Sequence, residues 1–66
     1  MENTFYYTIV DLNTNEEIIV YDRGQALDKL EELVKQNKHG SWQIDFYLVI
    51  DGEPKFIRTT AAYNKH

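Results

Sequence analysis

The segment from Asp11 to Glu16 comes closest to a chemical motif in this chain. Asp11, Asn13 and Asn15 place oxygen-bearing side chains at the first, third and fifth positions of a calcium-binding loop. The match then fails, because Glu16 stands where the sharp turn needs glycine and Asp22 stands where a bidentate glutamate is needed. Asn and Asp also favour tight turns, so the segment predicts a β-turn and no metal site.

The remaining residues give little support for catalysis. The histidines are His39, at the expected end of a helix, and His66, and neither has a serine or cysteine nucleophile arranged near it in sequence. The chain has no cysteine, which rules out thiolate chemistry and disulfides. A domain with one small sheet and one helix also has little room for a substrate pocket of about 300 Å³. We therefore expect no enzymatic activity and no cofactor.

Charge and composition limit the classes of partner. The chain has 66 residues, a formal net charge of -4 and 42% hydrophobic residues. Direct nucleic-acid binding is disfavoured, because neutralising phosphates requires Lys and Arg. The sequence has neither a polybasic patch nor a run of about 18 apolar residues, so we expect no association with a membrane. We expect one cytosolic domain over residues 1–66, with residues 61–66 as a short C-terminal tail.

The strongest structural signal is a β-hairpin. Apolar residues alternate with period two along the segment before Asp51-Gly52, and a second β-prone run, Lys55 to Thr59, follows it. The alternating residues are Trp42, Ile44, Phe46, Leu48 and Ile50. A two-residue Asp-Gly loop pairs Tyr47 with Phe56, Phe46 with Ile57 and Asp45 with Arg58. A longer loop using Pro54 shifts this register by one.

The remaining elements precede this hairpin. Residues 4–10 and 17–21 are rich in aromatic and β-branched types and predict two strands. Asp22 with Gln25 is a helix N-cap signature, and Gly40 suits the left-handed position after a helix, so a helix is expected over roughly residues 23–38. Its apolar stripe comprises Ala26, Leu27, Leu30, Leu33 and Val34.

These elements predict an α+β fold of β-β-α-β-β order, with a four-stranded antiparallel sheet and one helix on one face. Antiparallel pairing allows the strand orders 2-1-3-4 and 1-2-4-3. We favour 2-1-3-4, because the short second strand and the fourth strand, with Pro54, Lys55 and Arg58, suit edges.

The sheet face away from the helix is expected to be unusually apolar. Such a face is normally polar, whereas here it carries tyrosines and other apolar residues, which favour interfaces. The predicted partner-binding residues are Tyr6, Ile19, Tyr21, Tyr47, Phe56 and Arg58. A second, acidic surface is expected on the helix, at Asp28, Glu31 and Glu32.

Together these features favour a small non-enzymatic protein-interaction module. The open sheet face is expected to bind a protein partner or a second copy of the chain, as in small accessory or inhibitory proteins of bacteria and phages. Two alternatives stay open. One is an acidic inhibitor that mimics nucleic acid through the helix, and the other is a structural homodimer.

Overall fold

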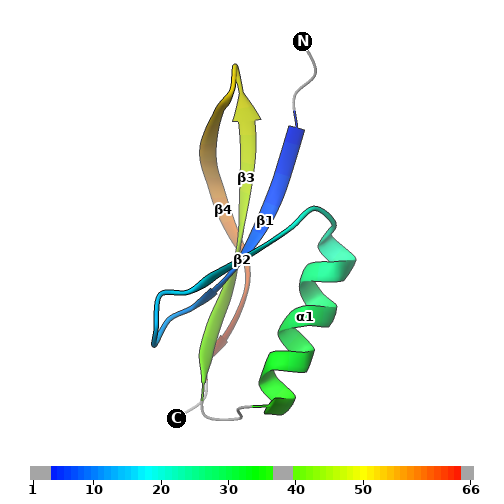
Figure 1. The fold of residues 1–66 in the computed structure, drawn as a ribbon, viewed down its shortest axis with the longest axis vertical. Coiled ribbons are helices and arrows are strands. Elements are labelled where there is room, and N and C mark those ends of the chain that lie inside the picture. Colours follow the sequence, from blue (N-terminus) through cyan, green and yellow to red (C-terminus); the bar gives the residue numbers. More distant parts are fainter. Residues whose placement is uncertain (1–3, 37–39, 65–66) are drawn as a thin grey trace.

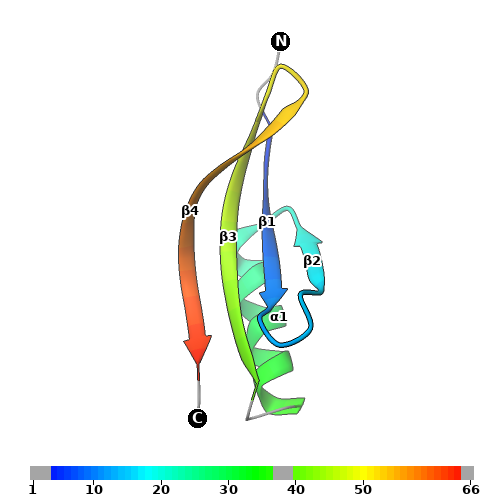
Figure 2. The same cartoon turned by 90° about the vertical axis from the view of Figure 1, so that its left-hand side faces the viewer.

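The computed structural model describes residues 4–36 and 40–64 and contains the elements expected from the sequence. They are β1 (Thr4–Asp11), β2 (Glu17–Val20), α1 (Arg23–Gln36), β3 (Ser41–Ile50) and β4 (Glu53–Asn64). The strands form one antiparallel sheet of order β2-β1-β3-β4, with α1 packed on β1 and β2 (Figures 1 and 2). The predicted α+β fold and the strand order 2-1-3-4 are thus confirmed.

Local hydrogen bonds account for the turn after β1 and the start of α1. Asp11 Oδ1 accepts the Asn13 amide at 2.8 Å, so this carboxylate serves the β-turn predicted there. Asp22 Oδ2 accepts the Gln25 amide at 3.1 Å, which confirms the N-cap. The helix is assigned to Gln36, and residues 37–39, with the predicted last turn and His39, lie outside the described residues.

The core lies between α1 and the sheet. Its buried members are Ile9, Ala26, Leu30, Trp42 and Ile44, and the half-buried residues packed around them include Tyr7, Leu33, Val34, Ala61 and Tyr63. Leu27 is the exception to the predicted apolar stripe, because 41% of it is exposed. The helix therefore contacts the sheet through a narrower stripe than its apolar composition suggests.

Gly40 is required for a different reason from the predicted one. Among the described glycines only Gly52, in the Asp51-Gly52 turn, has a positive φ. Gly40 is buried beneath the Trp42 indole, and a Cβ added there lies closest to Cη2, 2.6 Å from Cζ2 and 2.9 Å from Cζ3. Ordinary carbon contacts are about 3.5–4.0 Å. Gly40 thus makes room for a core side chain rather than adopting the left-handed conformation.

The hairpin register follows the prediction only near its turn. Asp51 and Gly52 form the two-residue loop with φ of 54° and 81°, and the predicted Tyr47–Phe56 pair is present. Beyond it the register shifts, so the predicted Phe46–Ile57 and Asp45–Arg58 pairs are wrong: Phe46 faces Arg58 and Asp45 faces Thr59.

The register shifts have a simple structural cause. In β4, Ile57 and Thr60 are left without partners opposite β3, as in β-bulges. Each extra residue moves the side chains that follow it to the opposite face of the sheet. A sequence that alternates with period two gives no sign of where such an extra residue lies.

Strand β4 also continues further than expected. Residues 61–64, predicted to begin a short tail, belong to β4, and Ala61 and Tyr63 pack against the core. Ala61 pairs with Ile44 and Tyr63 pairs with Trp42. The tail prediction is therefore wrong for these residues, whereas 65 and 66, including His66, lie outside the described part.

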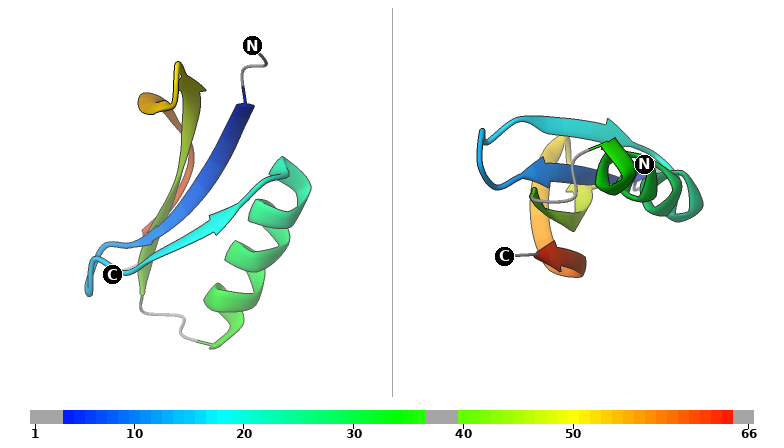
Figure 3. Two further views of the ribbon diagram at one scale, coloured as in Figure 1. Left: turned by 45° about the horizontal axis from the view of Figure 1, so that its top comes forward. Right: turned by 90° about the horizontal axis from the view of Figure 1, so that it is seen from below.

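The helix is too short to cover the whole sheet. Fourteen residues of α1 span about 21 Å, whereas the ten of β3 span about 33 Å. In Figures 1 and 3 the turn end of the β3–β4 hairpin accordingly extends past the start of α1. The molecule measures 43 × 19 × 16 Å. Both faces of this protruding end are thus free of the helix.

Candidate protein-interaction surface

Three aromatic side chains cross the outer face, which is the sheet face turned away from α1. Tyr6 on β1 pairs with Tyr47 on β3, which pairs with Phe56 on β4. The Tyr6 and Tyr47 rings are stacked, with centroids 5.1 Å apart and planes at 8°, and Phe56 meets Tyr47 edge-on at 5.7 Å and 71°. We call these residues the aromatic ladder. Such cross-strand contacts stabilise the sheet, yet Phe56 remains 54% exposed.

Tyr21 and Ile19 extend the apolar surface beyond the ladder. Ile19 is 54% exposed and pairs with Thr8 on the outer face, and Tyr21, just after β2, is 70% exposed. A cavity of about 590 Å³ lies beside the ladder and is lined by Thr4, Phe5, Tyr6, Tyr21 and Val49, so the expectation that the domain has little room for a pocket of about 300 Å³ is wrong. It forms where β2 has ended and β1 continues, because β2 pairs only with residues 7–10 of β1.

A buried polar group interrupts the outer face, and the sequence pattern does not reveal it. Asp45 is only 6% exposed, although it lies on the face without the helix. Its carboxylate accepts hydrogen bonds from Thr59 Oγ1 at 2.7 Å and from Gln43 Nε2 at 3.1 Å. The predicted Arg58 partner is replaced by these neutral donors. Such bonds offset the cost of burying the charge, and the bond from Thr59 ties β4 to β3 beside the bulges.

The polar group alters the chemistry of the ladder. The pKa of Tyr47 is raised above its usual value, first by burial and then by the negative charges of Asp45 and Glu17 and by Tyr6. Tyr47 therefore keeps its proton well above neutral pH and can donate a hydrogen bond from the centre of the ladder.

Arg58 does not belong to this surface. It faces Phe46 across the sheet, and it lines a cavity of about 430 Å³ with Tyr7, Arg23, Phe46, Thr59 and Thr60. This cavity is on the helix side, so the bulge at Ile57 has moved Arg58 to the opposite face from its predicted place. The other five predicted partner-binding residues, which are Tyr6, Ile19, Tyr21, Tyr47 and Phe56, lie on or beside the outer face.

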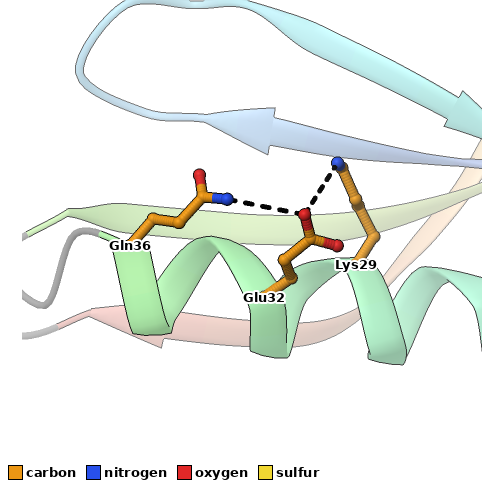
Figure 4. Close-up of polar contacts among 3 residues, drawn as sticks. All are labelled: Lys29, Glu32 and Gln36. Atoms are coloured by element: carbon orange, nitrogen blue, oxygen red, sulfur yellow. Dashed lines mark hydrogen bonds and ion pairs between the residues drawn. The ribbon is translucent and has the colours of Figure 1, made fainter.

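The acidic helix surface is partly neutralised by its neighbours. Glu31 is paired with Lys35 at 3.3 Å, and Glu32 lies 3.7 Å from Lys29 and accepts a hydrogen bond from Gln36 at 3.4 Å (Figure 4). Of the predicted acidic set, only Asp28 has no ion pair within the described part of the helix. The helix thus presents mixed charges rather than a row of free carboxylates.

The described residues contain neither a metal-binding cluster nor a membrane-spanning helix. No group of three or more His, Cys, Asp or Glu side chains in residues 4–36 and 40–64 is placed to hold a metal ion. Within the same ranges, no helix has the length and apolar character needed to cross a membrane. Comparison with protein-family models, with curated proteins and with solved structures found no match.

Proposed function

We propose that this protein is a non-enzymatic interaction module that binds another protein through its outer face. The observation that carries the proposal is the aromatic ladder with its exposed flanks. Phe56, Ile19 and Tyr21 are each more than half exposed in an otherwise marginally sized domain. Aromatic side chains, tyrosine above all, are enriched at the centres of protein interfaces.

The shape of the molecule supports the same proposal. The turn end of the hairpin extends past α1, and it exposes apolar residues on the helix side as well: Phe5 is 47% exposed and Ile50 40%. The bulge residue Ile57 is 43% exposed. Several large apolar side chains exposed at one end of the molecule favour an interaction site there. A partner that grips the hairpin would bury residues on both faces.

The proposal is tested by removing the two ladder rings nearest the hairpin turn. Tyr47→Ser with Phe56→Ser deletes both rings but no fully buried residue, so the monomer is expected to stay folded. Loss of two central aromatics should weaken partner binding by about tenfold or more. Leu12→Ser is the matched control, because Leu12 is 45% exposed but lies in the turn after β1.

The assay compares these variants in two measurements. First, the wild-type protein is used to capture a partner from a lysate of the source cells, and the partner is purified. Second, the affinity of that partner is measured for the wild type, the ladder variant and the Leu12→Ser control. Equal affinity for the wild type and the ladder variant contradicts the proposal, and so does unfolding of the ladder variant, because the rings are then structural.

Self-association is the second candidate. The observation favouring it is the free edge of β4, a strand of 12 residues at the end of the sheet that pairs only with β3. Long edges are templates for pairing with another chain. Sedimentation equilibrium over a hundredfold concentration range tests this. A dimer that persists in the ladder variant assigns the association to the free edge of β4, a dimer lost in that variant assigns the outer face to a second copy, and a strict monomer contradicts self-association.

A further inference from the structure

The helix-side cavity differs in chemistry from the outer face. We call it the arginine groove; it holds about 430 Å³ between the first turn of α1 and the middle of β4 and is lined by Tyr7, Arg23, Phe46, Arg58, Thr59 and Thr60. Tyr7 and Phe46 lie with ring centroids 5.1 Å apart and form an aromatic wall. Two arginines therefore line one groove together with two aromatic residues.

The two arginines differ from every other cation in the described residues. Lys29, Lys35 and Lys55 each lie within 4.0 Å of a glutamate, at 3.7, 3.3 and 3.6 Å. Within residues 4–36 and 40–64, neither Arg23 nor Arg58 has an acidic partner. The chain has a net charge of -4, so carboxylates outnumber cations. Even so, among the described residues the two arginines without an ion pair line the same groove.

The position of Arg23 adds to this. It is the first residue of α1, where the helix dipole disfavours a positive charge. Asp22 does not offset it by an ion pair, and its carboxylate caps the helix through the Gln25 amide at 3.1 Å. A positive charge at this position forms no stabilising contact within the described residues. A bound anion, in contrast, would pair with Arg23 and interact favourably with the helix dipole.

We propose that the arginine groove binds a carboxylate of an acidic peptide segment, with Arg23 and Arg58 as its cationic contacts. Planar guanidinium groups match carboxylates in bidentate geometry. Tyr7 and Phe46 provide the surface for an apolar side chain next to that carboxylate. The excess of negative charge on the chain opposes a long polyanion such as nucleic acid but tolerates a short acidic peptide.

This site is independent of the proposed function, because it lies on the opposite face of the sheet from the aromatic ladder. Deleting the ladder with Tyr47→Ser and Phe56→Ser should leave binding in the arginine groove within about twofold. Failure of one proposal therefore leaves the other intact.

The test is a titration of the full ¹⁵N-labelled chain, followed by NMR, with two tripeptide probes: acetyl-Glu-Phe-Glu-amide and its neutral counterpart, acetyl-Gln-Phe-Gln-amide. The acidic probe should shift the signals of Tyr7, Phe46, Thr60 and the arginine Nε groups, and the neutral probe should not. Arg23→Gln and Arg58→Gln should each weaken binding by about fivefold, the upper range for an exposed ion pair.

Lys35→Gln is the charge-matched control, because it removes one positive charge from the other end of α1, where Lys35 is 75% exposed. It should change the affinity by less than about twofold, and 0.5 M salt should weaken the wild-type interaction. Equal binding of the neutral probe, or equal weakening by Lys35→Gln, overturns the proposal. Tighter binding of inorganic phosphate or of a short oligothymidylate overturns the assignment to a peptide.

Discussion

Substitution of Gly40 by alanine tests the packing of the core most directly. The added Cβ meets Trp42 Cζ2 at 2.6 Å and Cζ3 at 2.9 Å, so the ring or the backbone must move by about 1 Å to restore ordinary contact. Trp42 is only 3% exposed, so any shift of its ring disturbs the packing of the core. Overpacking of this kind costs about 1–3 kcal/mol. A domain of this length has only about 3–10 kcal/mol of total stability, so the loss is large.

A double-mutant cycle with Trp42→Phe isolates this clash. Phenylalanine lacks the indole atoms that an alanine at residue 40 would strike, so Gly40→Ala should cost less than about 0.5 kcal/mol in that background. The coupling between the two sites should then be about 1 kcal/mol or more. The free energies of unfolding are measured by urea denaturation followed by far-ultraviolet circular dichroism. Tryptophan fluorescence is unsuitable, because Trp42 is the only tryptophan and the cycle replaces it.

The same cycle distinguishes steric packing from backbone conformation. If Gly40 were needed for a left-handed helix cap, the alanine penalty would be equal with tryptophan and with phenylalanine at residue 42. Additive penalties would therefore refute the steric account. Should a variant unfold in plain buffer, the measurements are repeated in a stabilising osmolyte, which strengthens burial equally in all four proteins.

Two further predictions concern the buried polar group and the ladder. Asp45→Ala should destabilise the fold by about 1–3 kcal/mol, because Thr59 and Gln43 lose a charged acceptor inside the sheet; a change in the urea midpoint indistinguishable from that of Leu12→Ser would contradict this role. The pKa of Tyr47 is raised in the folded state, so as pH rises the unfolded chain loses its phenolic proton first. The contribution of Tyr47 to stability is therefore fully present below the ordinary tyrosine pKa of about 10. It is lost as pH rises through the pKa of the folded state. Urea midpoints between about pH 8 and 11 should fall less steeply in Tyr47→Phe, and an unchanged slope would show that Tyr47 titrates normally.

Much of the candidate surface could be anticipated from sequence. Alternation with period two separates Tyr6 from its neighbours in β1 and Tyr47 from its neighbours in β3, and packing the more apolar set of each strand on the helix then places both tyrosines on the outer face. The Asp51-Gly52 turn fixes the Tyr47–Phe56 pair. Both signals are local, because each depends on neighbours along the chain or across a two-residue loop. The aromatic ladder follows from them directly.

The arginine groove could not be anticipated in the same way. It exists because the bulge at Ile57 turns Arg58 to the helix side and because α1 begins beside the middle of the sheet. A bulge depends on how two strands fit each other over their whole length, and Ile57 carries no local mark of being unpaired. The one available sequence signal was Arg23 at the start of a helix, where a cation is unfavourable.

The sequence by itself determined the order of the elements, the Asp22 cap and the tight turn, because periodicity, capping and turn chemistry act over a few residues. It narrowed the strand order to two possibilities, of which the charged and proline-bearing edges favoured the observed β2-β1-β3-β4. Only the tertiary structure decided the register beyond Phe56, the burial of Asp45, the extension of β4 to Asn64 and the steric role of Gly40. These depend on contacts between residues far apart in the chain, where the fit of one surface against another outweighs local preference.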